Sequence, residues 1–161
     1  MREFPYNRIA AVLFARRWAN DRNPAYYNFD DLGGDCTNFA SQCLFAGCGV
    51  MNYTPDVGWY YLSLNDRSPS WTGVEFLYEF LVNNRSVGPY GRRVPIEQLV
   101  AGDLIQLGRA DGSFYHTLVV LSTMPIIRIA AHTDNSLDRP LSTYNYAQAR
   151  YIHIDGARTW Q

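Results

Sequence analysis

The chain has 161 residues, with 14 basic and 15 acidic side chains and a formal net charge of −1. This length suits a single domain, residues 1–161, and the balanced charge gives no electrostatic reason to expect a nucleic acid or an anionic membrane as partner. No apolar run is long enough to span a bilayer, and Met1–Pro5 lacks the apolar stretch of a signal peptide. We therefore expect a cytoplasmic location, unless the chain is a domain excised from a longer exported protein.

The three cysteines are separated by seven and five residues, which is neither a zinc-ligand spacing nor an even disulfide set. This pattern favours a free reactive thiol, with no metal and no cofactor. The 12 tyrosines and 4 tryptophans suggest an aromatic-lined groove, although a tyrosine-rich core is an equally good interpretation.

The first predicted element is an amphipathic helix over residues 6–20 that ends near Asn23-Pro24. Its apolar face is expected to contain Ile9, Val12 and Leu13, widened by Ala10, Phe14 and Trp18. A polar and aromatic loop over residues 26–32 follows. In this loop Tyr26 or Tyr27 is a candidate to lie over a site and donate a hydrogen bond to a substrate, with packing as the favoured alternative.

Residues 33–44, Gly-Gly-Asp-Cys-Thr-Asn-Phe-Ala-Ser-Gln-Cys-Leu, have the strongest functional pattern in the chain. The two glycines can adopt backbone angles closed to other residues, and Cys36 then begins a helical apolar pattern that ends before Gly47. A thiol in the first turn of a helix is favoured as thiolate by unpaired N–H groups and the helix dipole. We predict that Cys36 is a solvent-accessible nucleophile, against the alternative of an ordinary buried cysteine.

Three further residues near this cysteine enter the prediction. Asp35 and Asn38 flank it and are candidate substrate-binding residues. Cys43 lies two turns further along the same helix face, so we expect it to be buried, inert and out of disulfide reach of Cys36.

Residues 48–69 are rich in turn-forming residues and predict a long loop. Trp59 and Trp71 are candidate walls of a substrate groove, with a core position as the alternative for each. A helix is then expected to begin at Thr72, because Glu75 three residues on completes a capping box. Its predicted buried stripe contains Val74, Leu77, Tyr78 and Leu81.

The second half of the chain has the pattern of short strands separated by turns. The predicted strands cover residues 104–107, 115–122, 126–132 and 150–154. Helices followed by an antiparallel sheet indicate an α+β architecture.

A thiolate nucleophile needs a general base, and only three histidines are present. His116 begins one predicted strand and His132 ends the next. If residues 123–125 form a three-residue loop, His116 faces His132 on one face of the sheet, so that one imidazole orients the other. The pairing depends on register, and Asp134 and Asn135 are the alternatives for the third position. His153 is interpreted as structural.

The run from Gly33 to Leu44 resembles the signature of the bacterial Putative amidase domain family, which is related to the papain-like NlpC/P60 and CHAP cysteine peptidases and amidases. The resemblance extends through Ser68-Pro69-Ser70-Trp71, Gly102-Asp103-Leu104-Ile105-Gln106, Tyr115-His116 and Arg139-Pro140-Leu141-Ser142. It implies a papain-like fold with N-terminal helices packed on an antiparallel sheet. It further implies Cys36 as nucleophile, His116 as base and His132 as the polar third residue.

These observations predict a thiol-dependent hydrolase that cleaves an amide or peptide bond through an acyl-enzyme. The resemblance suggests a peptide or peptidoglycan-fragment substrate. Two alternatives stay open, an acyltransferase that uses the same thiol and a binding module on the same scaffold without turnover. The sequence does not indicate an oligomeric state.

Overall fold

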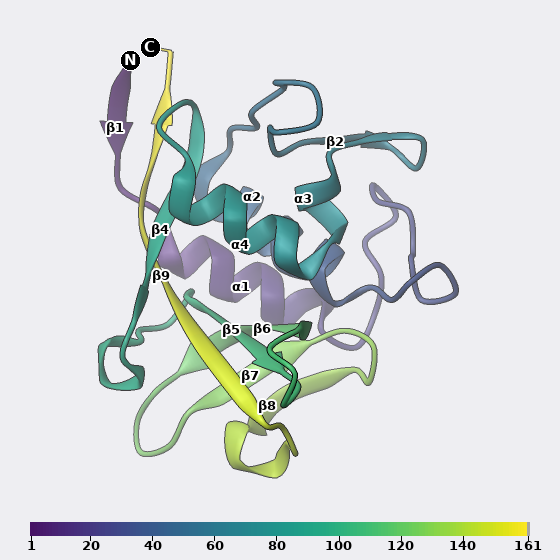
Figure 1. Ribbon diagram of the computed structural model, residues 1–161, viewed down its shortest axis with the longest axis vertical. Helices are drawn as coiled ribbons and strands as arrows, with labels where there is room; N and C mark the ends of the chain where they lie inside the picture. The colour runs from purple at the N-terminus through teal and green to yellow at the C-terminus, as the bar shows by residue number, and fades with distance from the viewer. Residues whose placement is uncertain (161) are drawn as a thin grey trace.

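The computed structural model describes residues 1–160 and has the predicted α+β architecture. Helices α1, α2 and α4 form a layer against one face of an antiparallel sheet, and the two ends of the chain lie side by side (Figure 1). The helices are α1 (Arg8–Trp18), α2 (Cys36–Cys48), α3 (Pro69–Thr72) and α4 (Val74–Asn83), with two 3-10 turns, η1 (Ile96–Gln98) and η2 (Leu141–Thr143). The strands are β1 (Arg2–Phe4), β2 (Tyr61–Ser63), β3 (Asp66–Arg67), β4 (Gly88–Val94), β5 (Leu104–Gly108), β6 (Phe114–Ser122), β7 (Arg128–Ala131), β8 (Ser136–Pro140) and β9 (Gln148–Thr159).

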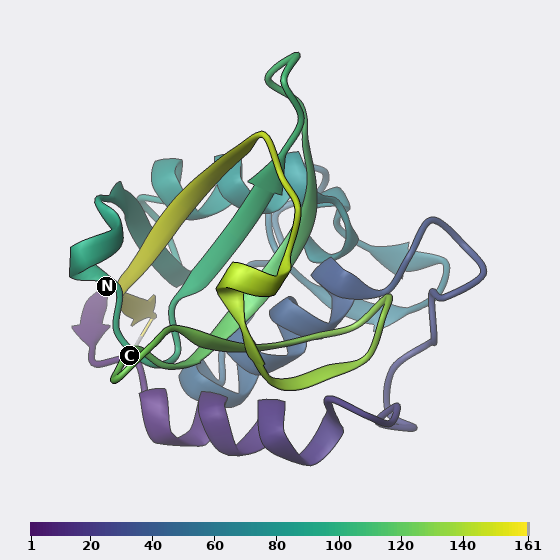
Figure 2. The ribbon, with the colours of Figure 1, turned by 90° about the horizontal axis from the view of Figure 1, so that it is seen from below.

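The main sheet has the order β1-β9-β5-β6-β7-β8, with β4 also paired to β9, and all of its pairings are antiparallel. Figure 2 shows β9, β5 and β6 running side by side across the molecule. Four of these strands were expected from the sequence, whereas β1, β4 and β8 were not. These three strands contain Arg, Glu, Asp, Gly or Pro at many positions, so their apolar alternation is weak.

The expected buried face of the first helix is correct only in part, because Val12, Phe14 and Trp18 pack against the core whereas Ile9 and Leu13 do not. Ile9 is 74% exposed and Leu13 is 61% exposed, whereas Ala11 and Ala15 are fully buried against the rest of the fold. Small residues allow α1 to approach α2 closely, with Ala11 and Ala15 at the centre of the buried face and Ile9 and Leu13 on the outer side. Residue size therefore shifted the buried face of α1 away from the one that hydrophobicity alone favoured.

The predicted helix start at Thr72 is displaced by two residues. The chain first forms the short helix α3. Gly73 has extended backbone angles, which end α3 and precede the start of α4. The side-chain oxygen of Thr72 accepts a hydrogen bond from Arg67 instead of capping a helix. The buried residues of α4 are Leu77, Phe80 and Leu81, so the predicted stripe is correct at two of these three positions.

The expected three-residue loop between β6 and β7 is also wrong. Ser122 pairs with Arg128, so five residues connect the strands, and Val119 pairs with Ala130. Continuing that register places Thr117, and not His116, opposite His132. Because successive residues of a strand point to opposite faces, His116 and His132 lie on different faces of the sheet.

None of the helices within residues 1–160 has the length and apolar character needed to cross a membrane. In the same residues, no three His, Cys, Asp or Glu side chains are grouped so that they could share a metal ion.

Candidate active site

Cys36 is the first residue of α2, as the sequence predicts. The turn before it needs its two glycines, because Gly33 and Gly34 have φ angles of 87° and 98°. The backbone N–H of Asp35 donates to the side-chain oxygen of Thr133 at 3.2 Å, which fixes the turn to the residues that follow β7. A side chain on Gly34 would also come within 3.3 Å of that oxygen.

The Cys36 sulfur lies between α2 and β6. Its neighbours are the side-chain oxygen of Thr37, at 3.7 Å, and the backbone N–H groups of Thr37 and Thr117. Burial raises the pKa of the Cys36 thiol, and these three donors oppose that rise. The cysteine is only 8% exposed, so the expected open access to solvent is wrong for this conformation.

Cys43 and Cys48 lie further along α2 and are buried and free of disulfides, as expected for Cys43. Burial raises the pKa of Cys48 to about 12 and that of Cys43 well above its ordinary value. Cys36 has the backbone N–H of Thr117 on β6 to oppose the effect of burial, whereas within the described residues Cys43 and Cys48 have no such donor from a strand.

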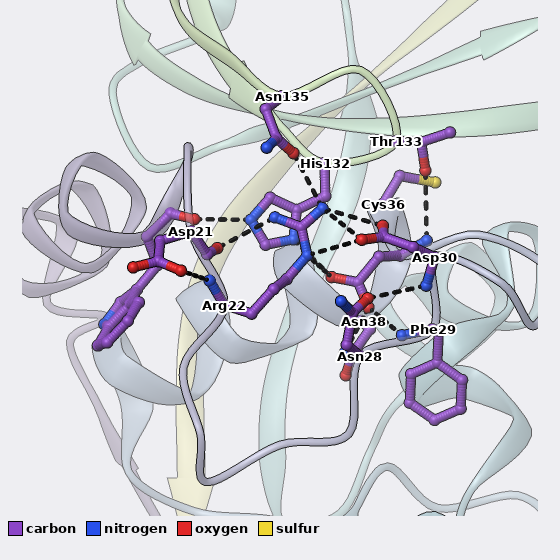
Figure 3. Close-up of polar contacts among 12 residues, drawn as sticks. Asp21, Arg22, Asn28, Phe29, Asp30, Cys36, Asn38, His132, Thr133 and Asn135 are labelled. Atoms are coloured by element: carbon purple, nitrogen blue, oxygen red, sulfur yellow. Dashed lines mark hydrogen bonds and ion pairs between the residues drawn. The ribbon is translucent and has the colours of Figure 1, made fainter.

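Asp35 is fully buried, and its partners Arg22, Asn38 and His132 belong to the polar cluster that Figure 3 shows. One carboxylate oxygen accepts hydrogen bonds from the backbone N–H of Phe29 at 2.8 Å and from the side chain of Asn38 at 2.9 Å. The other lies 2.5 Å from Nδ1 of His132 and 3.5 Å from Nε of Arg22. Asp35 therefore ties the loop before α2, the helix itself and the end of β7 together.

His132 is 1% exposed and both of its ring nitrogens have partners. Nδ1 contacts Asp35, Nε2 lies 2.7 Å from the carbonyl oxygen of Trp18, and the ring stacks on Phe39 with centroids 3.9 Å apart. No hydrogen bond joins His132 to His116 within residues 1–160. The expected contact between the two imidazoles is thus replaced by a contact between His132 and Asp35.

His116 is half-buried, and its ring nitrogens make no hydrogen bond within the described part of the chain. Burial lowers the pKa of His116 to about 4, with the Asp134 carboxylate opposing this shift and Arg139 adding to it. Its ring lies 5.8 Å from that of Tyr144. The imidazole is therefore neutral at pH 7 and has a free nitrogen to accept a proton.

A series of polar side chains connects the start of α2, next to Cys36, across the sheet to α4. The hydroxyl groups of Thr37 and Thr117 are 2.9 Å apart, and the Thr117 oxygen also accepts from Gln106 at 3.3 Å. Arg150 donates to Gln106 at 2.8 Å and forms an ion pair with Glu75. These contacts fix β6 against α2 at the position of Cys36.

The predicted substrate-binding residues divide into buried and exposed ones. Trp59 and Trp71 are fully buried, and Asn38 is 1% exposed with its amide bonded to Tyr27, Asp35 and Trp71, so these three offer no surface to a substrate. Asp35 is likewise closed off. Tyr27 is 43% exposed and lies against Phe29, which leaves it as the one predicted contact residue with open surface.

The structure adds three residues to the site that the sequence analysis did not select, namely Arg22, Thr117 and Thr133. Arg22 and Thr133 contact Asp35, beside Cys36, only through the fold. Thr117 had one signal, its position directly after His116. His153, interpreted as structural, forms a hydrogen bond with the buried carboxylate of Asp103 at 2.9 Å.

A cavity of about 700 Å³ lies between loop 52–58, α4 and residues 83–86. Neither Cys36 nor His116 lines it. This hollow is therefore separate from the candidate active site.

The fold and site define an α+β protein with a cysteine at the N-terminus of a helix and an unpaired neutral histidine on the strand beside it. The chain belongs to the Putative amidase domain family, whose match covers residues 5–154. The description of this family refers to an amidase activity.

Among curated proteins, the chain is 37% identical over 132 residues to the uncharacterized protein YhbB of Bacillus subtilis (strain 168). The aligned region covers 78% of this chain and 42% of that relative, so the chain spans less than half of the relative's length. No solved structure matches the chain.

Proposed function

We propose that this protein is a cysteine amidase or peptidase in which Cys36 is the nucleophile and His116 the general base, on a papain-like arrangement of helix and sheet. The observation that carries the proposal is the position of the Cys36 sulfur, which lies at the start of α2 beside the backbone N–H of Thr117 on β6. That peptide nitrogen belongs to the residue directly after His116, so the strand that carries the proposed base passes beside the nucleophile. The side chains of His116 and Thr117 point to opposite faces of β6, so the proposal requires the His116 ring to reach the sulfur around the edge of the strand.

The proposed reaction begins when His116 takes the proton of the Cys36 thiol. The thiolate attacks the amide carbonyl carbon, the sulfur–carbon bond forms, and His116 gives the proton to the amine as the carbon–nitrogen bond breaks. Water then attacks the acyl-enzyme with His116 again as base, which releases the acid and restores the thiol. At pH 7 His116 is neutral and so is able to accept a proton. Its lowered pKa makes it a weak base in this closed conformation, and the proposal requires that pKa to rise toward 7 when substrate binds.

The oxyanion of this reaction requires hydrogen-bond donors. Within residues 1–160, the backbone N–H of Cys36 has no acceptor, which makes it a candidate donor at the positive end of α2. The exposed side chain of Tyr27 is a candidate for the second donor.

Asp134 takes the third position in this proposal in place of His132. The support is electrostatic, since Asp134 is the carboxylate that raises the pKa of His116. His132 is fully committed to Asp35 and Trp18. The other reserve candidate, Asn135, accepts a hydrogen bond from Arg22.

The substrate class proposed is a peptide or a peptidoglycan stem peptide, on the basis of the family resemblance. The test is hydrolysis of a panel of peptidoglycan fragments and simple peptide amides by the intact chain and by Cys36→Ser and His116→Ala. We expect turnover of at least one substrate, with a loss of about 10²-fold or more in each variant. Turnover that survives in Cys36→Ser would contradict the proposal, and binding of a fragment without turnover would favour the binding module.

The same protein allows a test of the nucleophile without a substrate. Iodoacetamide should alkylate Cys36 well before Cys43 or Cys48, because only Cys36 has donors from β6 as well as a helix N-terminus. Mass spectrometry of peptides after timed labelling at neutral pH measures the three rates. Equal labelling of all three cysteines would remove the case for Cys36.

A further inference from the structure

The residue before Cys36 raises an electrostatic problem for a thiolate. Asp35 is a fully buried carboxylate directly adjacent to the nucleophile in sequence, and its charge raises the pKa of the Cys36 thiol. Two like charges on neighbouring buried residues disfavour each other, because little water is present to screen them. A site that uses Cys36 as a thiolate therefore needs something to offset Asp35.

The partners of His132 indicate how this charge is offset. The Trp18 carbonyl can only accept, so Nε2 of His132 must carry a proton. The 2.5 Å contact between Nδ1 and the Asp35 carboxylate requires a second proton between those two atoms. Whether that proton lies on His132 or on Asp35, the pair as a whole has no net charge.

The groups around the pair preserve this balance. Arg22 lies 3.5 Å from Asp35 and forms an ion pair with Asp30, and Figure 3 shows Arg22 and His132 converging on this region with Cys36 at its edge. The four ionisable groups Arg22, Asp30, Asp35 and His132 thus sum to zero. The other groups near the site are His116 on β6, which is neutral, and the oppositely charged Asp134 and Arg139 that flank it.

We propose that Asp35 and His132 form a positioning pair for Cys36, which holds the turn at which α2 begins and cancels the carboxylate charge beside the sulfur. In this role His132 acts on the nucleophile through Asp35, and not on the base through a contact with His116. The proposal deepens the proposed function and rests on Cys36 being its nucleophile.

The test measures the alkylation rate of Cys36 by iodoacetamide as a function of pH in four proteins. These are the wild type, His132→Gln, Asp35→Asn and the double variant. His132→Gln leaves a buried carboxylate unbalanced, so its profile should move to higher pH and its rate at pH 7 should fall about tenfold, the effect of a shift of about one pH unit. In Asp35→Asn the midpoint of the rate–pH profile should lie at the wild-type pH or at a lower one.

The double variant is the decisive member of the set. It removes both charges, so its profile should return to that of the wild type although it has lost more native hydrogen bonds than either single variant. A purely structural role would make the double variant worse than His132→Gln, and that outcome would overturn the proposal.

Arg22→Gln provides a second route, since Arg22 lies near the surface and the variant does not remove a core side chain. It should shift the profile in the same direction as His132→Gln, by a smaller amount. If His132→Gln fails to fold, the double variant and Arg22→Gln still give the comparison, and an unchanged profile in Arg22→Gln would then count against the pair.

The chain offers a matched control in a second His–Asp pair, the partly buried His153 and the fully buried Asp103. His153 lies on β9, separated from β6 by β5, so His153→Gln should lower thermal stability without moving the Cys36 profile. A shift of similar size in His153→Gln would show that the assay reports stability and would overturn the proposal.

A His116→Ala background separates this inference from the proposed function. The shift caused by His132→Gln should persist there, because it does not depend on the base. Its disappearance would mean that His132 acts through His116. If wild-type Cys36 is not alkylated at any pH, the nucleophile itself is refuted, whereas a reactive Cys36 with unchanged profiles in all variants refutes only the pair.

Discussion

The two histidines expected to work together differ most clearly at the scale of the residue. His132 has both ring nitrogens bonded and is closed to solvent, whereas His116 has neither nitrogen bonded within the described residues. A fully bonded imidazole is a good structural group, because moving a proton on or off it breaks a buried hydrogen bond. An unbonded neutral imidazole is free to accept one.

His116 should therefore leave a measurable trace in the pH dependence of stability. The pKa of His116 is about 4 in the folded protein, against an ordinary value of 6.5 that applies when it is unfolded. Between these values the unfolded chain binds the extra proton, so stability is lost as the pH falls from about 6.5 to about 4. His116→Gln removes this titrating group, so the free energy of unfolding that is lost on acidification should be smaller by at most about 3 kcal/mol.

Urea unfolding at pH 7 and pH 4.5 measures this difference for both proteins. The wild type should lose more stability than His116→Gln between the two pH values. Equal losses would show that His116 is not held neutral by its surroundings.

At the scale of the element, α2 is positioned by the close approach of α1 at its C-terminal end. Gly47 faces Tyr6, and its carbonyl oxygen accepts the backbone N–H of Asn7 at 2.8 Å. A side-chain carbon on Gly47 would lie 2.3 Å from the Tyr6 ring. Gly49 ends the helix with a φ of 70°, but nothing lies within 4 Å of where its side chain would be.

These two glycines allow a paired test of why α2 needs them. Gly47→Ala should destabilise by about 3 kcal/mol because Tyr6 and the backbone behind it have to move. Gly49→Ala should cost only about 1 kcal/mol, the strain of a left-handed residue without a clash. Thermal unfolding of both variants measures the order, and a larger loss in Gly49→Ala would contradict the packing argument.

At the scale of the whole molecule, Asp103 connects the helix layer to the sheet. This fully buried carboxylate accepts from Arg8 of α1 at 2.7 Å, from His153 of β9 at 2.9 Å, and from the backbone N–H groups of Val100 and Ile154. Four donors from three segments converge on one side chain just before β5. Its removal leaves Arg8 and His153 without their buried partner.

Asp103→Ala should therefore destabilise the fold by about 3–5 kcal/mol, the cost of breaking a buried charged network by removing one partner. The labelling rate of Cys36 under folding conditions should stay close to that of the wild type, because Asp103 lies outside its surroundings. Calorimetry together with timed alkylation tests both statements. A variant of wild-type stability would show that the network is dispensable.

The sequence by itself was sufficient for the class of fold and for the position of Cys36 at the start of a helix. Glycine freedom at residues 33 and 34, the helical pattern after Cys36 and the β-branched strands are local properties, and the structure has each of them. Papain-like ancestry and the base His116 remain predictions that the sequence makes and that the proposed experiments test.

Only the tertiary structure decided which side chains meet. A loop two residues longer than expected between β6 and β7 separated His116 from His132, and periodicity contains no information on such a register. The burial of Trp59 and Trp71, the outward side of α1 and the contact of His132 with Asp35 depend on residue size and on contacts between segments up to 97 residues apart. Local pattern fixes elements and their chemistry, whereas the partner of a buried charge is chosen by packing over the whole chain.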